Sequence, residues 1–531
     1  MQEQGDRNHG VTDPLVYPAI GAHRNGVEEE PAMSNDRVFN RREFLGLTGA
    51  ALATAAVGWS GAAAARGLDG MRTAPAFDMR LGAQELVVGP LLMYNITHRQ
   101  DASSWRPWGG VQTQQAVEEE AHRIGRELRD LCTSADFAVR TLPLVELAGA
   151  QQVETLNRLG ADVLLVYASG GGTEILDALA GLGKPMIIFV REDSGPYYLW
   201  HEIVDARFLR SHTDRLAQVN VDFQDVVVDD TAEILWRLRA LYGLKNILGR
   251  RIVCIGGPSG WSCPEAPDLA RERFKLDMVT FPVSELNPMI EAGRKNKLLM
   301  RRCQREAGDY LSAGDVTLET TSDAVAEAFL LAKLFRDLMR ESGACAITVN
   351  GCMGSYAGIM PCLTLSLLND AGYMAYCESD FVTIPAGMLM HYISGRPTYL
   401  CNPTYPHQGR MLFAHCSAPR RMDGKALEPV KIMTHFESDH GVATKVGFRK
   451  GQLLTIIKPD FGAKHWLALT GQIVDTPLLP TCRAQVEVKL RADPRDVVEN
   501  LRGFHCMLAY GDHTKEVAYA AKKVGIQVQV L

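Results

Sequence analysis

The chain has no Cys-x-x-Cys pair and no cysteine/histidine quartet with zinc-finger spacing, although its 531 residues include 12 cysteines. This absence excludes the common small zinc folds. Most cysteines lie inside apolar runs, as Cys254 does in RIVCIGG and Cys345 does in GACAITV. We therefore expect buried reduced thiols, although an oxidising compartment would permit a few disulfides.

An excess of positive charge is also absent, since the formal net charge is -6 at pH 7. Proteins that bind nucleic acids need a basic surface, so we expect no nucleic-acid partner. Beyond residue 66, no hydrophobic run is long enough to cross a bilayer. We therefore expect a soluble mature chain with no stable membrane insertion once the leader has been cleaved.

Residues 1–66 form a leader with two different parts. The first forty residues are polar and rich in Gly, Pro and Glu, which predicts disorder. Asn40–Leu45 (NRREFL) then introduces an uncharged Gly/Ala-rich run that ends at Ala65. This order resembles a twin-arginine export signal with a small-residue cleavage region, and it predicts a periplasmic or secreted protein. A membrane anchor and a cytoplasmic tail are the alternatives.

After the leader, short apolar runs alternate with amphipathic stretches, which is typical of parallel sheets covered by helices. Two three-layer α/β domains are predicted in series, over residues 81–228 and 229–373. Their expected strands are Glu85–Tyr94, Asp162–Tyr167, Pro185–Val190, Arg251–Gly256, Asp277–Phe281 and Ala344–Val349, and their clearest helices are Thr113–Cys132, Leu147–Leu159 and Asp323–Glu341.

The pattern changes in residues 374–531, where β-rich segments predominate. The expected strands there are Lys431–Glu437, Gln452–Lys458, Leu467–Val474 and Ala484–Leu490, with helices at Pro385–Ile393, Pro494–Leu501 and Thr514–Val524. This part of the chain is predicted to form a third domain built on an antiparallel sheet or barrel.

A carboxylate pair, Glu378 and Asp380, stands directly after an apolar segment and before a predicted helix. Carboxylates at such an edge cost free energy unless a metal, a cation or a helix N-terminus pairs with them. Asp380 could simply cap the following helix. The alternative is a site that distant residues complete.

Several distant residues are candidates for that completion. Trp261 follows a predicted strand, where open α/β sheets bind ligands, and its ring could stack on a sugar or lie half-buried in a loop. His415 ends an apolar run, and His435 and Glu437 would share one face if they lie on a strand. His505 enters an apolar segment near the carboxyl end. Imidazole and carboxylate together suit Mn, Fe or Zn.

These residues resemble the motifs of the L-fucose/L-arabinose isomerase family. The resemblance rests on Leu368-Asn369-Asp370, Cys377-Glu378-Ser379-Asp380, Ser394-Gly395-Arg396-Pro397, His415 and Phe504-His505-Cys506. It implies two α/β domains with a β-rich third domain, and a homo-oligomer, either hexamer or trimer. It also implies aldose–ketose isomerisation with a divalent metal, usually Mn2+, held by Asp380, His505 and Glu378.

The implied chemistry removes a proton next to a carbonyl and returns it one carbon away through an enediol. A metal stabilises the enediolate charge, and a carboxylate moves the proton. Our candidates for the proton transfer are Glu378, Asp380 and Glu437, and His415 would polarise a substrate oxygen. Trp261 would bind the sugar ring.

One departure from the family pattern leaves a second function open. Fucose isomerases carry another glutamate some two dozen residues before the motif aspartate, where this chain has an apolar run around Leu365. The chain is therefore either a metal-dependent sugar isomerase or a carbohydrate-binding protein on the same fold that has lost catalysis.

Overall fold

The computed structural model describes residues 79–96, 111–192, 204–209, 221–351 and 356–531. The predicted export signal lies outside these residues. Within them, no helix is long and apolar enough to span a membrane. The eleven cysteines of the described residues are all reduced, and most are buried, as expected.

The first unit is a six-stranded parallel sheet in the order β2-β1-β4-β5-β6, with β3 paired to the other end of β1. Its strands are β1 (Leu86–Met93), β2 (Val139–Thr141), β3 (Val145–Leu147), β4 (Val163–Ala168), β5 (Met186–Val190) and β6 (Val226–Val228). Its helices are α2 (Gln114–Ser134), η2 (Ala150–Arg158), α3 (Thr173–Ala180), α5 (Ala206–Leu209), η3 (Phe223–Asp225) and α6 (Thr231–Ile247), where η marks a 3-10 helix.

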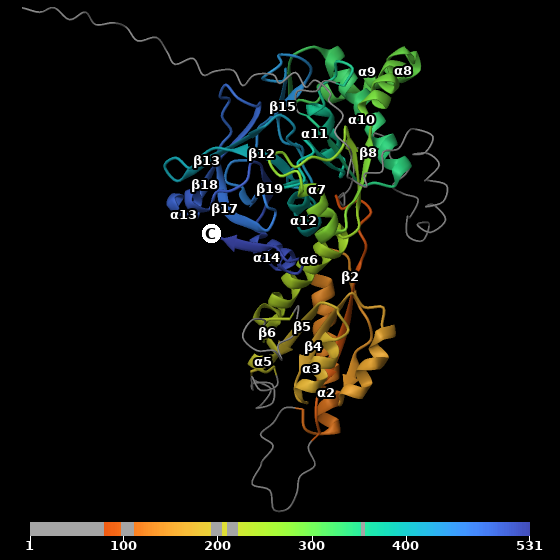
Figure 1. Ribbon diagram of the computed structural model, residues 1–531, viewed down its shortest axis with the longest axis vertical. Coiled ribbons are helices and arrows are strands. Elements are labelled where there is room, and N and C mark those ends of the chain that lie inside the picture. Colours follow the sequence, from red (N-terminus) through yellow and green to blue (C-terminus); the bar gives the residue numbers. More distant parts are fainter. Residues whose placement is uncertain (1–78, 97–110, 193–203, 210–220, 352–355) are drawn as a thin grey trace, which may run out of the picture. The chain divides into compact units, whose positions relative to one another are not determined.

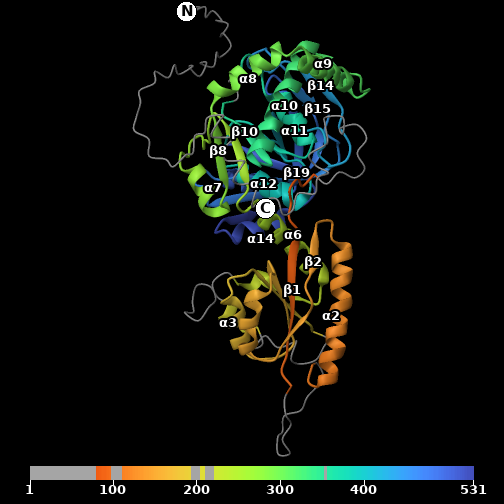
Figure 2. The same ribbon diagram turned by 90° about the vertical axis from the view of Figure 1, so that its right-hand side faces the viewer.

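Both faces of this sheet are buried, because successive side chains of a strand point to opposite sides. In β4, Val163 and Leu165 pack into the core under α2, whereas Leu164 and Val166 pack into the core under α3. Figure 2 shows α2 and α3 on opposite sides of β1. This arrangement confirms the predicted α/β layers and explains why these strands read as continuous apolar runs.

The second unit is a four-stranded parallel sheet in the order β11-β10-β7-β8. Its strands are β7 (Arg251–Ile255), β8 (Asp277–Phe281), β10 (Ala346–Val349) and β11 (Met374–Tyr376). Its helices are α7 (Ala266–Phe274), α8 (Val283–Lys295), α9 (Lys297–Leu311), α10 (Ser322–Ser342), α11 (Cys362–Asp370) and α12 (Ile384–Ser394). Since β11 pairs with β10, this sheet includes residues beyond 373. The predicted domain limits stay a prediction.

The third unit is a closed antiparallel barrel of six strands, β16-β19-β12-β13-β18-β17, in which β17 pairs back to β16. A seventh strand, β20, adds in parallel to β17. The elements are β12 (Tyr399–Pro403), β13 (Arg410–His415), β16 (Leu453–Pro459), β17 (His465–Asp475), β18 (Ala484–Leu490), β19 (Cys506–Tyr510), β20 (Gln527–Val530), α13 (Pro494–Asn500) and α14 (Thr514–Lys522). Figure 1 shows these strands grouped together, which confirms the predicted β-rich part.

Two predicted elements differ from the structure. Residues 150–158 form the 3-10 helix η2 instead of the α-helix expected over 147–159, and Leu147 belongs to β3. The strand expected over 431–437 is β14 (Val430–Met433), so His435 and Glu437 lie beyond its end. β14 joins β9 (Val316–Glu319) and β15 (Ala443–Val446) in a separate three-stranded sheet. Its pairing ends at Met433, and the backbone turns because His435 N–H donates to the carbonyl of His440.

Gly503 fixes the entry of the chain into β19. Its φ is +70°, and a Cβ added there would lie 2.0 Å from the backbone oxygen of Pro459. A non-glycine residue would therefore suffer both the left-handed strain and a backbone collision.

We predict that Gly503→Ala lowers the free energy of unfolding by about 1–3 kcal/mol. The measurement is chemical denaturation monitored by circular dichroism. Gly525→Ala is the matched control, because Gly525 has a φ of +75° but no atom within 4 Å of the added Cβ. Equal losses in the two variants would show that the collision with Pro459 does not contribute.

Candidate active site

The segment from Cys377 to Asp380 follows β11 at the edge where the parallel strands of the second unit end. Glu378 and Ser379 both have left-handed backbones, with φ of 67° and 48°. Two successive non-glycine residues in this region are strained, and such strain persists only where the surroundings impose it. Here the loop after β7 imposes it: Ser259 N–H donates to the Ser379 carbonyl at 3.0 Å, and Phe381 N–H donates to the Ser259 carbonyl at 2.9 Å.

This backbone directs the Glu378 carboxylate between two buried imidazoles. Oε1 lies 3.3 Å from His415 Nε2, and Oε2 lies 3.2 Å from His505 Nε2. The side chain of Glu378 is 9% exposed, and those of His415 and His505 are 2% and 0% exposed. Three residues far apart in the sequence therefore form one buried cluster.

Asp380 is the second carboxylate of the cluster, and both of its oxygens are hydrogen-bonded. Oδ2 lies 2.8 Å from His505 Nδ1 and accepts from the hydroxyl of Thr383 at 2.9 Å, while Oδ1 accepts from the backbone N–H of Val382 at 3.1 Å. The predicted helix-capping role is wrong, because the N-cap of α12 is Thr383 and no side chain of the described residues accepts a cap hydrogen bond there. Asp380 shapes the turn before α12 and also contacts His505.

The two histidines come from neighbouring positions of the barrel. His415 is the last residue of β13, and its Nδ1 lies 3.1 Å from the hydroxyl of Ser417. His505 directly precedes β19, where the ammonium of Lys458 donates to the carbonyl of Phe504 at 2.7 Å. Because β12 pairs with both β13 and β19, the barrel sets the spacing of the two imidazoles.

An aromatic pair connects this buried cluster with the surface. Trp261 stacks on Phe504 with 4.8 Å between ring centroids, and the rings contact His505 edge-on at 5.5 and 4.7 Å. Trp261 is 49% exposed and Phe504 is 40% exposed. The predicted sugar-stacking residue thus lies directly beside the predicted late histidine.

The donor atoms of the cluster fit a divalent cation. Glu378 Oε2 and His505 Nε2 are buried without a hydrogen-bond partner, although they are only 3.2 Å apart. Cys377, Glu378 and His415 also offer ligand atoms that lie within 4.8 Å of one another. Burying polar atoms without a partner costs free energy, and a bound cation would offset that cost for Glu378 Oε2 and His505 Nε2. These atoms and the three-residue group therefore fit a metal site.

Glu437 lies apart from this grouping. Its side chain is about half exposed, and the structure pairs it with His435, whose Nε2 lies 3.9 Å from its Oε2. Among the described contacts, none joins Glu437 to Glu378 or His505. The prediction that His435 and Glu437 share a strand face is wrong, because β14 ends before them.

The apolar run around Leu365 forms the buried helix α11. Asp370 at its end accepts hydrogen bonds from the backbone N–H groups of Arg420 and Arg421, both at 2.8 Å. This carboxylate stabilises a loop of the chain. Leu365 itself is fully buried, so the structure places no carboxylate at that position.

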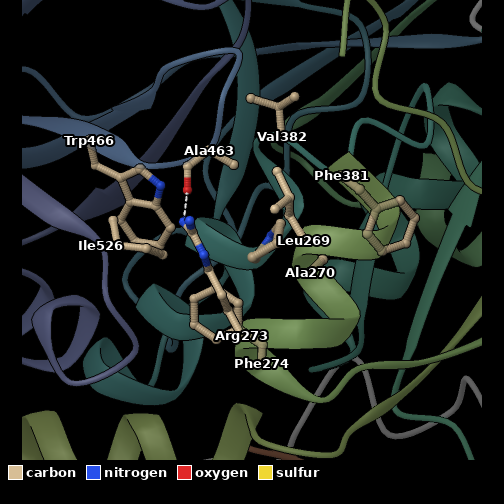
Figure 3. A pocket seen from close by; sticks show the side chains of 10 residues that line it. Leu269, Ala270, Arg273, Phe274, Phe381, Val382, Ala463, Trp466 and Ile526 are labelled. Carbon is tan, nitrogen blue, oxygen red and sulfur yellow. Dashed lines mark hydrogen bonds between the residues drawn. The ribbon is translucent and has the colours of Figure 1, made fainter. Parts of the chain in front are cut away.

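A small apolar cavity lies next to the residues that follow Asp380 (Figure 3). Phe381 and Val382, which directly follow Asp380, line it together with residues of α7 and the barrel. The guanidinium of Arg273 closes one side by donating to the carbonyl of Ala463. The lining is almost entirely apolar, so this cavity offers little for sugar recognition.

Sequence reasoning quoted two further members of the site within its motifs but gave them no role. Cys377 lies directly before the motif glutamate, and Phe504 lies directly before His505. Adjacency to a motif residue was the available signal for both. It was not decisive, since neighbouring residues of an extended chain usually point to opposite sides.

The cluster sets opposite pKa shifts in its two central groups. Burial raises the pKa of Glu378, but the neighbouring His415 and His505 lower it more. The resulting pKa lies far below the usual range of a glutamate. Burial lowers the pKa of His505, but contacts with Asp380 and Glu378 overcome this and raise it. In the metal-free cluster the Glu378 carboxylate therefore favours the protonated form of the His505 imidazole.

We predict that, in the metal-free protein, the contribution of the Glu378–His505 pair to the free energy of unfolding is largest in mildly acidic solution. The lowered pKa of Glu378 gives stability that is lost as the pH falls below its ordinary value of 4.5, and the raised pKa of His505 gives stability that is lost as the pH rises above 6.5. The measurement is the unfolding midpoint against pH after treatment with a chelator.

The variant His505→Gln should lose about 1–3 kcal/mol, because Glu378 and Asp380 each lose a buried partner. It should also lose the decline in stability above pH 6.5. His465→Gln is the control, since His465 is about half exposed. A decline that persists in His505→Gln would assign it to another group.

Comparison with known proteins gives weak but specific similarity. The chain is 25% identical over 240 residues to the sulfoquinovose isomerase of Clostridium sp. strain MSTE9, and the match covers 43% of this chain and 52% of that protein. The chain thus spans about half the length of the curated relative it matches. No protein-family model matches the sequence.

Solved structures add nothing to this similarity. A probable maltose operon transcriptional repressor from Staphylococcus aureus is 11% identical, covers 54% of this chain and 88% of its own, and has a TM-score of 0.15. A periplasmic solute-binding protein of an ABC transporter from Actinobacillus succinogenes 130z, with bound D-allose, is 10% identical, covers 59% and 92%, and has a TM-score of 0.13. Scores this low support no argument about fold or function.

Proposed function

We propose that the chain is a sugar isomerase that interconverts an aldose and a ketose through an enediol, with its active site at the Glu378 cluster. The observation that carries this proposal is the buried Glu378 carboxylate held between His415 and His505, directly beside the exposed Trp261–Phe504 pair. The similarity to a sugar isomerase supports the same reaction class.

The aromatic pair would orient the substrate. The apolar face of a sugar ring stacks on aromatic side chains, and Trp261 and Phe504 present such a surface next to His505. A ring stacked there would bring its polar edge toward Glu378 and His415. The chain then binds the sugar with one element of the second sheet and one of the barrel.

Glu378 is the group proposed to move the proton. Its pKa is lowered by two imidazoles, so it is ionised at neutral pH, which is the form that accepts a proton. Because the lowered pKa also makes it a weaker base, the catalysis would depend on holding the sugar carbon directly beside the carboxylate. The same low pKa lets it return that proton readily to the adjacent carbon. His415, which contacts the other oxygen of Glu378, would polarise a substrate oxygen.

Asp380 acts in this proposal as a positioning residue. Its contact with His505 Nδ1 fixes the orientation of the ring and leaves Nε2 directed at Glu378. Carboxylates beside metal-binding histidines have this role in many proteins. Asp380 is less suited to bind a metal directly, because its oxygens already accept three hydrogen bonds.

A divalent cation, for which Mn2+ is our proposal, would be held by Glu378 and His505, with His415 and Cys377 beside them. When bound, such an ion supplies Lewis-acid stabilisation of the charge that develops on the sugar oxygens. Imidazole and carboxylate donors suit Mn, Fe and Zn, whereas the Cys377 thiol favours softer ions.

The decisive experiment combines isomerase assays with isotope exchange. Purified protein, loaded with Mn2+ or Zn2+, is incubated in D2O with a panel of aldoses. The panel includes sulfoquinovose, because the similar protein is a sulfoquinovose isomerase. We expect ketose formation with deuterium at the exchanged carbon. Glu378→Gln and His505→Asn should each lower kcat/KM by about 100-fold or more.

Glu437→Gln is the matched control, because Glu437 is the other glutamate that the sequence proposed for proton transfer. It should keep its activity within about threefold, as expected for an exposed side chain. A loss as large as that of Glu378→Gln would overturn our assignment. Tight sugar binding without exchange by the wild type would favour the binding protein that has lost catalysis, as the missing carboxylate at Leu365 suggests.

We also propose, from the sequence of residues 40–65, that the chain is exported through the twin-arginine route, and, from the resemblance to the isomerase family, that the mature protein is a homo-oligomer. Replacing Arg41 and Arg42 by lysine should retain the protein in the cytoplasm of an expressing bacterium. Immunoblots of cell fractions measure this outcome. Unchanged export of the double variant would contradict the signal.

A further inference from the structure

Three cysteines and a histidine that the proposed isomerase reaction does not use meet around Cys416. Cys416 packs with Cys362 and Cys482, and the imidazole of His435 is among the groups that act on its thiol. Cys362 and Cys416 are buried and form a small core with Ala443, against which the partly buried Cys482 packs. We refer to Cys362, Cys416, Cys482 and His435 as the thiol cluster.

The barrel brings Cys416 and Cys482 together. Strands β13 and β18 are antiparallel, and His415 pairs with Ala484 at the last position of their register. Cys416 follows His415, and Cys482 precedes Ala484 by two residues, so the register continued by one position sets Cys416 opposite Arg483, the neighbour of Cys482. The backbone N–H of Arg483 donates to Cys416 Sγ at 3.5 Å, which holds the sulfur against this segment.

Cys362 approaches from a different element, since it is the first residue of α11. It is 1% exposed, whereas Cys482 has intermediate exposure. A reagent from solvent therefore reaches Cys482 first. Cys416, which is 0% exposed, reacts only through a neighbour that it already contacts.

We propose that Cys416 and Cys482 form a reversible disulfide, for which Cys482 is the entry point and a low-molecular-weight disulfide is the oxidant. This modification is independent of the proposed isomerase function. Two contacting thiols, one partly exposed and one buried, are the arrangement that thiol–disulfide exchange requires.

The chemistry balances in two exchange steps. The Cys482 thiolate attacks oxidised glutathione, which forms a mixed disulfide at Cys482 and releases one glutathione thiolate. The Cys416 sulfur then attacks the Cys482 sulfur, and its proton passes to the adjacent imidazole of His435. The second glutathione leaves, so two protein thiols are oxidised and one small disulfide is reduced.

A metal ion is the competing use of these side chains, because three thiols and an imidazole are also a zinc donor set. The four groups are not among the described side chains whose ligand atoms all lie within 4.8 Å of one another. In the thiol cluster each partner contacts Cys416, but the ligand atoms do not all gather around one point as a metal would require. A bond between Cys416 and one partner needs only the contact of two sulfurs.

The test uses the full-length protein, equilibrated in glutathione buffers of increasing oxidised fraction, trapped with an alkylating reagent and digested with trypsin without reduction. Cys416 and Cys482 fall in separate tryptic peptides, Met411–Arg420 and His465–Arg483. We expect these two peptides to become linked, and the unfolding midpoint to rise by a few degrees on oxidation.

Cys482→Ser should abolish both the linked peptide and the rise in the unfolding midpoint. Cys132→Ser is the matched control, because Cys132 is also partly exposed but lies on α2, outside the thiol cluster. It should behave as the wild type. Trapping of the wild-type protein keeps the proposal testable even if a variant fails to fold.

Three outcomes would overturn the proposal. A link from Cys416 to Cys362 would assign the wrong pair. Glutathione retained on Cys482 would show that Cys416 cannot reach it. A stoichiometric metal in the purified protein would identify a metal site instead, if its removal by a chelator also makes these cysteines accessible to alkylation.

Discussion

The candidate site depends on one buried electrostatic contact, that between the carboxylate of Glu378 and the imidazole of His505. It joins the end of a parallel sheet to the start of a barrel strand, across 126 intervening residues in the sequence. Neither group is stable alone in its surroundings, because burial disfavours the charge of each. Together they compensate each other, and the position of one determines the position of the other.

Other features of the site follow from this contact. The left-handed backbone at Glu378 and Ser379 is costly, and the hydrogen bonds of Ser259 maintain it. Asp380 fixes the ring of His505 from the opposite side, while the barrel supplies His415 at a set spacing. The imidazoles offset the burial of the carboxylate, but one of its oxygens lies outside hydrogen-bond geometry and is therefore suited to contact a metal or a sugar hydroxyl.

The same barrel strand serves two chemistries that remain separate. His415 and Cys416 are neighbours at the end of β13, yet His415 faces Glu378 while Cys416 faces the thiol cluster. Successive residues of an extended chain point to opposite sides, so one backbone segment supports both. Cys377 and Glu378 are also neighbours, but both offer ligand atoms to the same site. The difference arises because the backbone at Glu378 is not extended.

The sequence by itself determined the α/β layers, the β-rich carboxyl-terminal part and most strand positions, because apolar periodicity reflects which faces are buried. It also singled out Glu378, Asp380, His415 and His505 as polar residues in apolar surroundings that match family motifs, and Trp261 from its place after a strand. It misplaced His435 and Glu437 on a strand, because nothing local marks where the pairing of β14 stops.

Only the tertiary structure decided which of these residues meet. It joined Glu378 to both histidines, turned Asp380 toward His505, placed Phe504 beside Trp261 and kept Glu437 outside the cluster. The physical reason is that distances between residues more than a hundred positions apart are fixed by sheet pairing and barrel closure. Neither leaves a local trace in the chain.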